Sequence, residues 1–167
     1  MKKERNISIL ILLFIGLFAI NNSYGQNYEK EYAVELNESK QGYWIHKKNT
    51  EIYEKYLVSL EEFGFAEQTG TLTYEILRGS GLSGEKGTYL RGKRINTIIY
   101  VDQTGKIVHV QIGIPAEAFT TDKSDKTRMN LEDIAKMDER IRTHKVRVKP
   151  NNPKKKQVII MGYAERF

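Results

Sequence analysis

The stretch Arg94-Ile-Asn-Thr-Ile-Ile-Tyr-Val-Asp-Gln-Thr-Gly-Lys-Ile-Val-His-Val-Gln-Ile-Gly-Ile114 decides the fold. Two runs rich in β-branched residues flank residues 102–105, and Gly105 can supply the positive φ that closes a short hairpin loop. Apolar residues alternate along both arms, as in strands with one buried face. This alternation predicts a core face made of Ile95, Thr97, Ile99 and Val101 on the first arm and Val108, Val110, Ile112 and Ile114 on the second. Because an isolated hairpin is marginal in water, it needs further strands or a covering helix.

Both kinds of partner are present in the sequence. Residues 51–63 carry apolar side chains at helical spacing and end at Gly64, a natural helix terminator. A second helix is predicted after the N-cap Asn130, with a buried stripe of Leu131, Ile134, Met137 and Ile141. Further strands are expected within residues 27–39, 41–45, 71–77 and 157–164. The predicted fold class is therefore α+β, an antiparallel sheet with two amphipathic helices packed on it.

The N-terminus has the features of a secretory signal peptide. A basic start, Met1-Lys-Lys-Glu-Arg5, precedes an apolar run over residues 7–20, and a short polar segment ends at Gly25. The apolar run is about 14 residues, whereas a membrane-spanning helix needs roughly 20. We therefore expect a leader at residues 1–25 and a single α+β domain at residues 26–167, exported to the periplasm or secreted. An uncleaved membrane anchor is the alternative, and after cleavage no stable membrane span is expected.

Composition narrows the classes of function. Without the three basic residues and one acidic residue of the leader, the net charge of +6 becomes +4, which indicates at most a mild preference for acidic partners. The chain has no cysteine, so it has neither disulfides nor a thiol nucleophile. We interpret the lysines at 154–156 as solvated charges that oppose aggregation of the apolar strand beside them, rather than as a nucleic-acid-binding patch.

Residues 94–167 follow the order strand, glycine hairpin, strand, helix, proline loop and strand. The segments that carry this order are Ile99-Tyr-Val-Asp-Gln-Thr-Gly-Lys-Ile-Val-His-Val110, Leu131-Glu-Asp-Ile-Ala-Lys-Met137, Val146-Arg-Val-Lys-Pro150 and Lys156-Gln-Val-Ile-Ile160, with the terminal Phe167. This order resembles the C-terminal domain of TonB-like energy transducers, in the form found in exported proteins of Bacteroidota. A long proline-rich spacer and the family's tyrosine-proline entry segment are absent from the sequence. The resemblance therefore implies a shared β-β-α-β unit and a strand-edge binding mode rather than energy transduction.

Catalytic and cofactor signatures are weak. Gly79, Gly81 and Gly84 match G-x-G-x-x-G, but a second strand rather than a helix is expected after them, so nucleotide binding is not predicted. His46, His109 and His144 have no metal-ligand spacing, and no nucleophile motif is present. For a hydrolase, Glu75 or Asp102 with His109 would be the candidates. We expect no enzyme activity, no metal and no cofactor, and we interpret the only tryptophan, Trp44, as a core anchor rather than a ligand platform.

The leading functional hypothesis is an exported interaction module of the cell envelope that contacts a protein partner by pairing along a strand edge. The last strand is expected at the outside of the sheet, with free backbone groups on one side. Its predicted partner-binding residues are Gln157, Val158, Ile159, Ile160, Met161, Gly162 and Tyr163. The alternative is a periplasmic small-ligand-binding protein with a pocket between helix 51–63 and the sheet.

The predicted leader can be tested on native material. We expect the intact mass of the protein purified from its own cells to correspond to a chain that begins near Gln26. A full-length species retained in the inner membrane would instead support the membrane anchor.

Overall fold

The computed structural model describes residues 27–39, 41–48, 51–67, 90 and 92–166. The expected leader, the strand expected at residues 71–77 and the glycine-rich segment 78–87 lie outside these ranges. The described residues form, in chain order, α2 (Tyr28–Glu31), β1 (Tyr32–Leu36), β2 (Gly42–Lys47), α3 (Glu51–Glu54), α4 (Leu60–Phe63), β3 (Gly64–Glu67), β4 (Arg94–Asp102), β5 (Ile107–Pro115), the 3-10 turn η1 (Ala116–Ala118), α7 (Leu131–Thr143), β6 (Arg147–Pro150) and β7 (Val158–Arg166).

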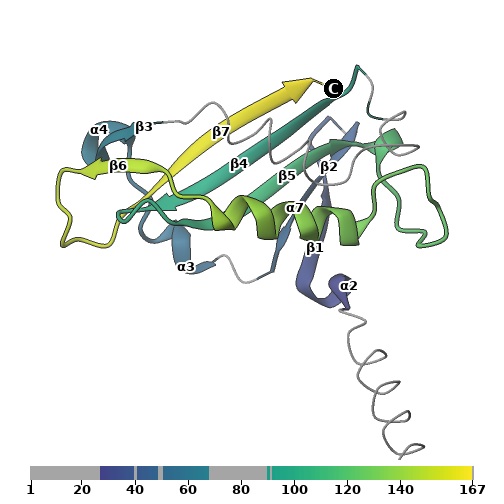
Figure 1. The fold of residues 1–167 in the computed structure, drawn as a ribbon, viewed down its shortest axis with the longest axis horizontal. Helices are drawn as coiled ribbons and strands as arrows, with labels where there is room; N and C mark the ends of the chain where they lie inside the picture. Colours follow the sequence, from purple (N-terminus) through teal and green to yellow (C-terminus); the bar gives the residue numbers. More distant parts are fainter. Residues whose placement is uncertain (1–26, 40, 49–50, 68–89, 91, 167) are drawn as a thin grey trace, which may run out of the picture.

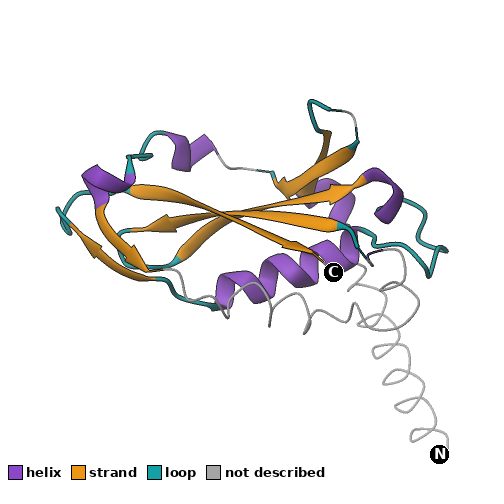
Figure 2. Ribbon diagram, turned by 90° about the horizontal axis from the view of Figure 1, so that it is seen from above, coloured by secondary structure: helices purple, strands orange, loops and turns teal. Residues whose placement is uncertain are grey.

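Five strands form one antiparallel sheet in the order β1-β2-β5-β4-β7 (Figure 1). The hairpins β1–β2 and β4–β5 are joined because β2 pairs with β5. β7 pairs with the full length of β4 without a register shift, from Arg94 opposite Arg166 to Asp102 opposite Val158. α7 runs along one face of this sheet (Figure 2), and β3 and β6 form a separate two-stranded sheet. The predicted α+β class is therefore confirmed.

The central hairpin forms as predicted, and Gly105 is required in it for two reasons. Its φ is 81°, which glycine adopts without strain. A Cβ at this position would also lie 2.1 Å from the carbonyl oxygen of Val146, whose N–H donates to Gly105 O at 2.8 Å. Asp102 Oδ1 closes the turn by accepting from the N–H groups of Thr104 at 2.8 Å and Lys106 at 3.1 Å. The turn thus closes the hairpin and binds the segment that follows α7.

The predicted alternation is wrong at one position of the second arm. The register places His109 opposite Tyr100 but Ile107 opposite Val101, so Val108 is the extra residue of a β-bulge. Ile107 therefore occupies the buried position, and Val108 is only half-buried. All the other predicted core positions of the two arms are buried.

α7 begins and packs as the sequence predicts. Asn130 Oδ1 accepts from the N–H groups of Glu132 and Asp133, and the Asp133 carboxylate accepts from the Asn130 N–H at 2.9 Å, a complete capping box. Its buried side chains are Ile134, Ala135, Met137, Asp138 and Ile141, whereas Leu131 is half-buried. In the described part of the chain, no helix is both long enough and apolar enough to span a lipid bilayer.

A buried carboxylate ties α7 to the sheet. Asp138 is 1% exposed, and its Oδ2 accepts from the Tyr32 hydroxyl at 2.9 Å while its Oδ1 accepts from Arg142 Nε at 2.8 Å. Lys47 Nζ lies 3.9 Å from the same carboxylate. Arg142 also donates to the carbonyl oxygen of Val108 on β5. Burial, together with the charge of Asp138, raises the pKa of the Tyr32 hydroxyl, which therefore remains a proton donor.

The single helix predicted over residues 51–63 is not formed; α3 and α4 are separate short helices. Between them, the Val58 N–H donates to Val158 O at 3.0 Å and the Val158 N–H donates to Tyr56 O at 2.8 Å. Leu57 thereby forms a parallel bridge with Val158 at the start of β7. This pairing with a distant strand overrides the helical periodicity of the segment.

α4 then starts at a new cap. Ser59 Oγ accepts from the Glu62 N–H at 3.2 Å, and the Glu62 carboxylate accepts from the Ser59 N–H at 3.0 Å. This capping box marks a helix start inside the range that was predicted as one helix.

The bulge makes a matched pair of substitutions informative. We expect Val110→Asp to lower the free energy of unfolding by more than about 3 kcal/mol, because it places a carboxylate without a partner in the core. Val108→Asp, two residues away, should lower the free energy of unfolding far less. Val108 is half-buried, and the positive charge of Arg142, which bonds to the Val108 carbonyl, is close to the new carboxylate. Urea unfolding of both variants checks this, and equal losses would contradict the observed register.

Candidate functional site

The residues predicted to bind a partner lie on or next to β7, which ends the sheet order in the described part of the chain (Figure 1). The structure divides them into buried, half-buried and exposed residues, of which Met161 and Tyr163 are half-buried. Gln157, Val158 and Ile159 are buried, so their side chains are not available to a partner. Ile160 is 49% exposed and Gly162 is exposed. The accessible part of the predicted site therefore begins at Ile160.

Hydrogen bonds establish which backbone groups of β7 point outward. The N–H and C=O of Val158 bond to the segment of Tyr56 and Val58, on the side away from β4. In an antiparallel strand, successive residues direct their backbone groups alternately to the two sides. The register with β4 is unbroken, so Ile160 and Gly162 also direct their N–H and C=O outward. Ile159 instead directs its groups toward β4.

Apolar and basic side chains surround the start of this edge. Leu57, which bridges to Val158, is 37% exposed, and Leu60 on α4 is 55% exposed. Residues 154–156 are exposed lysines, and Lys156 Nζ lies 4.1 Å from the centre of the Tyr56 ring. The edge of β7 thus combines outward backbone groups, exposed aliphatic side chains and positive charge.

Two of the three histidines meet on the face of the sheet that carries Tyr100. The ring centres of His46 and His109 are 5.6 Å apart, and Tyr100 lies edge-on to His109 at 4.9 Å. Tyr53 of α3 stacks on His109 at 6.5 Å. The β2–β5 pairing brings these residues together, and no local sequence signal indicated it. His144, by contrast, is the C-cap residue of α7.

His109 is 1% exposed, and its Nε2 is buried without a hydrogen-bond partner. Burial, together with the positive charges of Arg142 and His46, lowers its pKa to about 3. His109 is therefore neutral in the folded state at ordinary pH.

The catalytic candidates do not converge among the described residues. Asp102 uses its carboxylate to close the hairpin turn, and no hydrogen bond joins it to His109. Glu75 lies outside the described ranges. Asp102 and His109, the two candidates that the structure describes, thus form no acid–base pair.

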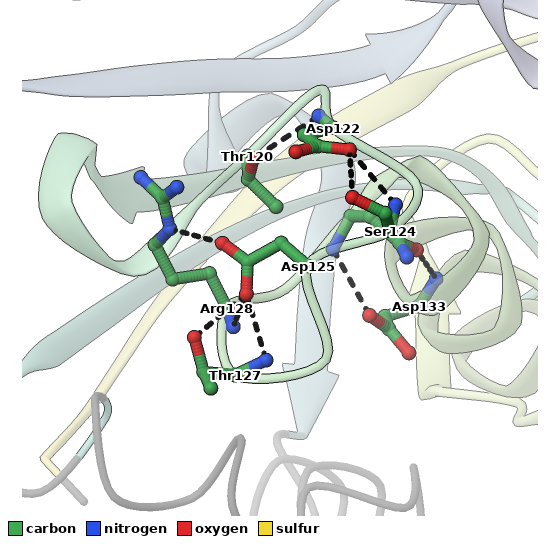
Figure 3. Close-up of polar contacts among 8 residues, drawn as sticks. Thr120, Asp122, Ser124, Asp125, Thr127, Arg128 and Asp133 are labelled. Atoms are coloured by element: carbon green, nitrogen blue, oxygen red, sulfur yellow. Dashed lines mark hydrogen bonds and ion pairs between the residues drawn. The ribbon is translucent and has the colours of Figure 1, made fainter.

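The loop before α7 is polar, but its carboxylates are used internally (Figure 3). Asp122 Oδ1 accepts from Ser124 N–H at 2.8 Å. Asp125 accepts from the Thr127 hydroxyl at 2.6 Å and from Arg128 Nε at 2.6 Å. These bonds hold the pKa of the Asp125 carboxyl well below its usual range. Within the described ranges, no group of His, Asp and Glu side chains is arranged to hold a metal ion.

A hollow of about 570 Å³ lies where the β1–β2 turn, the start of β4 and the end of β5 meet. Its lining comprises Asn37, Ser39, Gln41, Gly42, Tyr43, Trp44, Arg94, Asn96, Gly113, Ile114, Pro115, Ala116 and Glu117. None of these belongs to residues 51–63, so this hollow is not the pocket expected between that segment and the sheet. Trp44 is half-buried and lines the hollow rather than belonging to the buried core of the described residues.

The low pKa of His109 predicts a loss of stability in acid. The unfolded state takes up a proton near the ordinary value of 6.5, whereas the folded state resists it until about pH 3, so stability falls as the pH drops through this interval. We expect the free energy of unfolding to fall by about 2 kcal/mol from this residue between pH 7.5 and pH 5. Urea unfolding of His109→Phe should show a correspondingly smaller loss. His144→Gln is the control and should behave as wild type; identical losses in wild type and His109→Phe would contradict the assignment.

Comparisons with known proteins show a likeness in fold. No family model matches the sequence, and no curated protein does either. The chain is similar in structure to a DUF5043 family protein from Bacteroides uniformis ATCC 8492, with a TM-score of 0.55 and 10% sequence identity over 81% of this chain and 79% of that chain. The resemblance to TonB-like domains stays a prediction. At 10% identity the likeness shows a shared fold alone, and its Bacteroides source is consistent with a Bacteroidota-type protein.

Proposed function

We propose that the protein is an exported interaction module that binds an extended segment of a protein partner along the outer edge of β7. The observation that carries the proposal is the pairing of Val158 with residues 56–58. A piece of extended chain is already bonded to the outer side of β7 at its first residue. Continuing that ladder requires only a second extended segment, beginning opposite Ile160.

The exposed edge suits an added strand. Ile160, Gly162 and Ala164 are all exposed, and a Cβ at Gly162 would meet no atom within 4 Å. Backbone hydrogen bonds would supply affinity, while side chains on alternate positions would supply specificity. The order β4, β5, α7 and β7, with the short strand β6 of the second sheet between α7 and β7, resembles that of TonB-like C-terminal domains. The edge binding mode that this resemblance implies agrees with the proposal.

Charge and exposed apolar surface define the partner's chemistry. The lysines at 154–156 flank the start of the edge, and Leu57 and Leu60 are exposed beside it. A fitting partner segment is extended, apolar on alternate residues and acidic at the end that lies near the lysines. Asp102 closes the hairpin turn, and His109 lies in the aromatic cluster. These structural roles agree with a binding function without catalysis.

The proposal is tested by comparing two substitutions at one position. Ile160→Pro removes an outward N–H and should reduce partner capture about tenfold or more. Ile160→Ala retains that N–H and should reduce capture by no more than about fivefold. The measurement is quantitative capture from native envelope by the tagged mature protein, after circular dichroism shows that both variants fold. Full capture by a folded Ile160→Pro variant would place the contact on another surface.

A further inference from the structure

We propose that the hollow at the Arg94 end of β4 binds an acidic saccharide, with a sugar ring stacked on Trp44 and the sugar carboxylate bound by Arg94. This site lies at the opposite end of β4 from Asp102 and the Val158 start of β7, and it goes beyond the strand-edge function. Its volume of about 570 Å³ falls within the range of small-molecule sites.

The position of Trp44 is prepared by the strand next to it. Gly113 lies opposite Trp44 in the β2–β5 register, and a Cβ on Gly113 would lie 2.8–3.1 Å from three carbon atoms of the indole ring. Gly113 is not among the glycines with positive φ, so the backbone does not require a glycine here. Its missing side chain instead lets the indole ring lie against the strand. A ring held in this way can offer its remaining surface to a ligand without losing further side-chain entropy.

The polar side chains of the hollow mainly offer hydrogen-bond donors. Arg94 is exposed and has no ion-pair or hydrogen-bond partner in the described part of the chain. Asn96 lies two residues further along β4, on the same face of the strand. Among the described residues that line the hollow, the only carboxylate is Glu117, which is paired with Lys93 at 2.6 Å. The unneutralised charge that the described residues bring to the hollow is therefore positive.

The wall opposite β4 is rigid. Asn37 Oδ1 accepts from Ser39 Oγ at 3.0 Å and from the N–H groups of Gln41 at 3.0 Å and Gly42 at 3.3 Å. The amide NH₂ of Asn37 is left as a donor. The Ala116 N–H donates to Gln41 O at 3.0 Å, which joins this turn to the end of β5. The Asn37 amide and the indole are thus positioned before any ligand arrives.

These features select one class of ligand. A simple carboxylate would use Arg94 but not the indole surface, and a neutral sugar would use the indole but could offer the guanidinium only uncharged hydroxyl acceptors. An acidic sugar uses both: its C–H face packs on the aromatic ring, its hydroxyls accept from the amides, and its carboxylate can accept two hydrogen bonds from arginine.

Because Trp44 is the only tryptophan, its fluorescence reports directly on the hollow. The probe is trigalacturonate added to the mature protein, with the neutral trisaccharide maltotriose and with sodium acetate as comparisons. We expect a saturable change with trigalacturonate, binding of maltotriose at least about tenfold weaker, and no saturable change with acetate. Equal affinity for the two trisaccharides, saturable binding of acetate, or no saturable change with any probe would overturn the proposal.

Variants locate the binding. Arg94→Gln should weaken trigalacturonate binding about tenfold or more, whereas Arg140→Gln, an exposed arginine of α7, should leave it unchanged. Gly113→Ala should also weaken it, because the added methyl group displaces the indole. If Gly113→Ala fails to fold, the Arg94 and Arg140 pair decides. Unaltered binding by Arg94→Gln, or equal losses in the two arginine variants, would overturn the proposal.

Discussion

The buried carboxylate of Asp138 is the constraint on which the packing of helix against sheet depends. An ionised group that is 1% exposed is costly to bury unless hydrogen bonds and opposite charge compensate it. Tyr32 of β1 and Arg142 of α7 provide that compensation; the bond to Arg142 lies within the helix, whereas the bond to Tyr32 depends on how the helix lies on the sheet. Apolar contacts alone would tolerate small shifts of α7, whereas losing either donor would leave part of the charge unsatisfied. The network therefore holds α7 in the observed position on the sheet.

The same network explains why the bulge at Val108 is tolerated. A bulge disrupts the regular ladder between two strands and leaves the extra residue without its usual pairing. Here the Val108 carbonyl accepts from Arg142, which is itself bonded to Asp138. The bulge also changes which side chains face the core, since Ile107 rather than Val108 lies opposite Val101. Helix position and strand register are thus coupled through one arginine.

Local patterns predicted the central hairpin and α7, because their signals lie within a few residues of each element: a glycine turn, alternating apolar residues, and the cap of Asn130 with Asp133. The prediction of one helix over residues 51–63 is wrong because Val58 bonds to Val158. Periodicity cannot reveal such a pairing between distant segments. The cap formed by Ser59 and Glu62 was the one local sign of the break. The hollow could not be predicted from the sequence either, because Asn37, Arg94 and Gly113 come from three separate segments that meet only in the fold. The residue type of Trp44 suggested a core anchor, but Trp44 is half-buried and lines the hollow, a place that depends on the β2–β5 register.

The described residues cover the outer edge of β7 at its start but not further along it, and this difference bears on whether the edge binds a partner. An exposed strand edge invites aggregation, and proteins usually cover it, shorten it or place charges on it. Here residues 56–58 cover the edge at Val158, and the lysines at 154–156 precede it. Protection against aggregation alone would favour a polar side chain at the next outward position, yet that residue is Ile160, which is 49% exposed. Because Val158 is already paired, an added strand can begin only after it, in one register. The exposed Ile160 that follows offers apolar surface to such a strand. An edge that is blocked at one end and apolar beyond the block suits selective strand addition better than it suits complete protection.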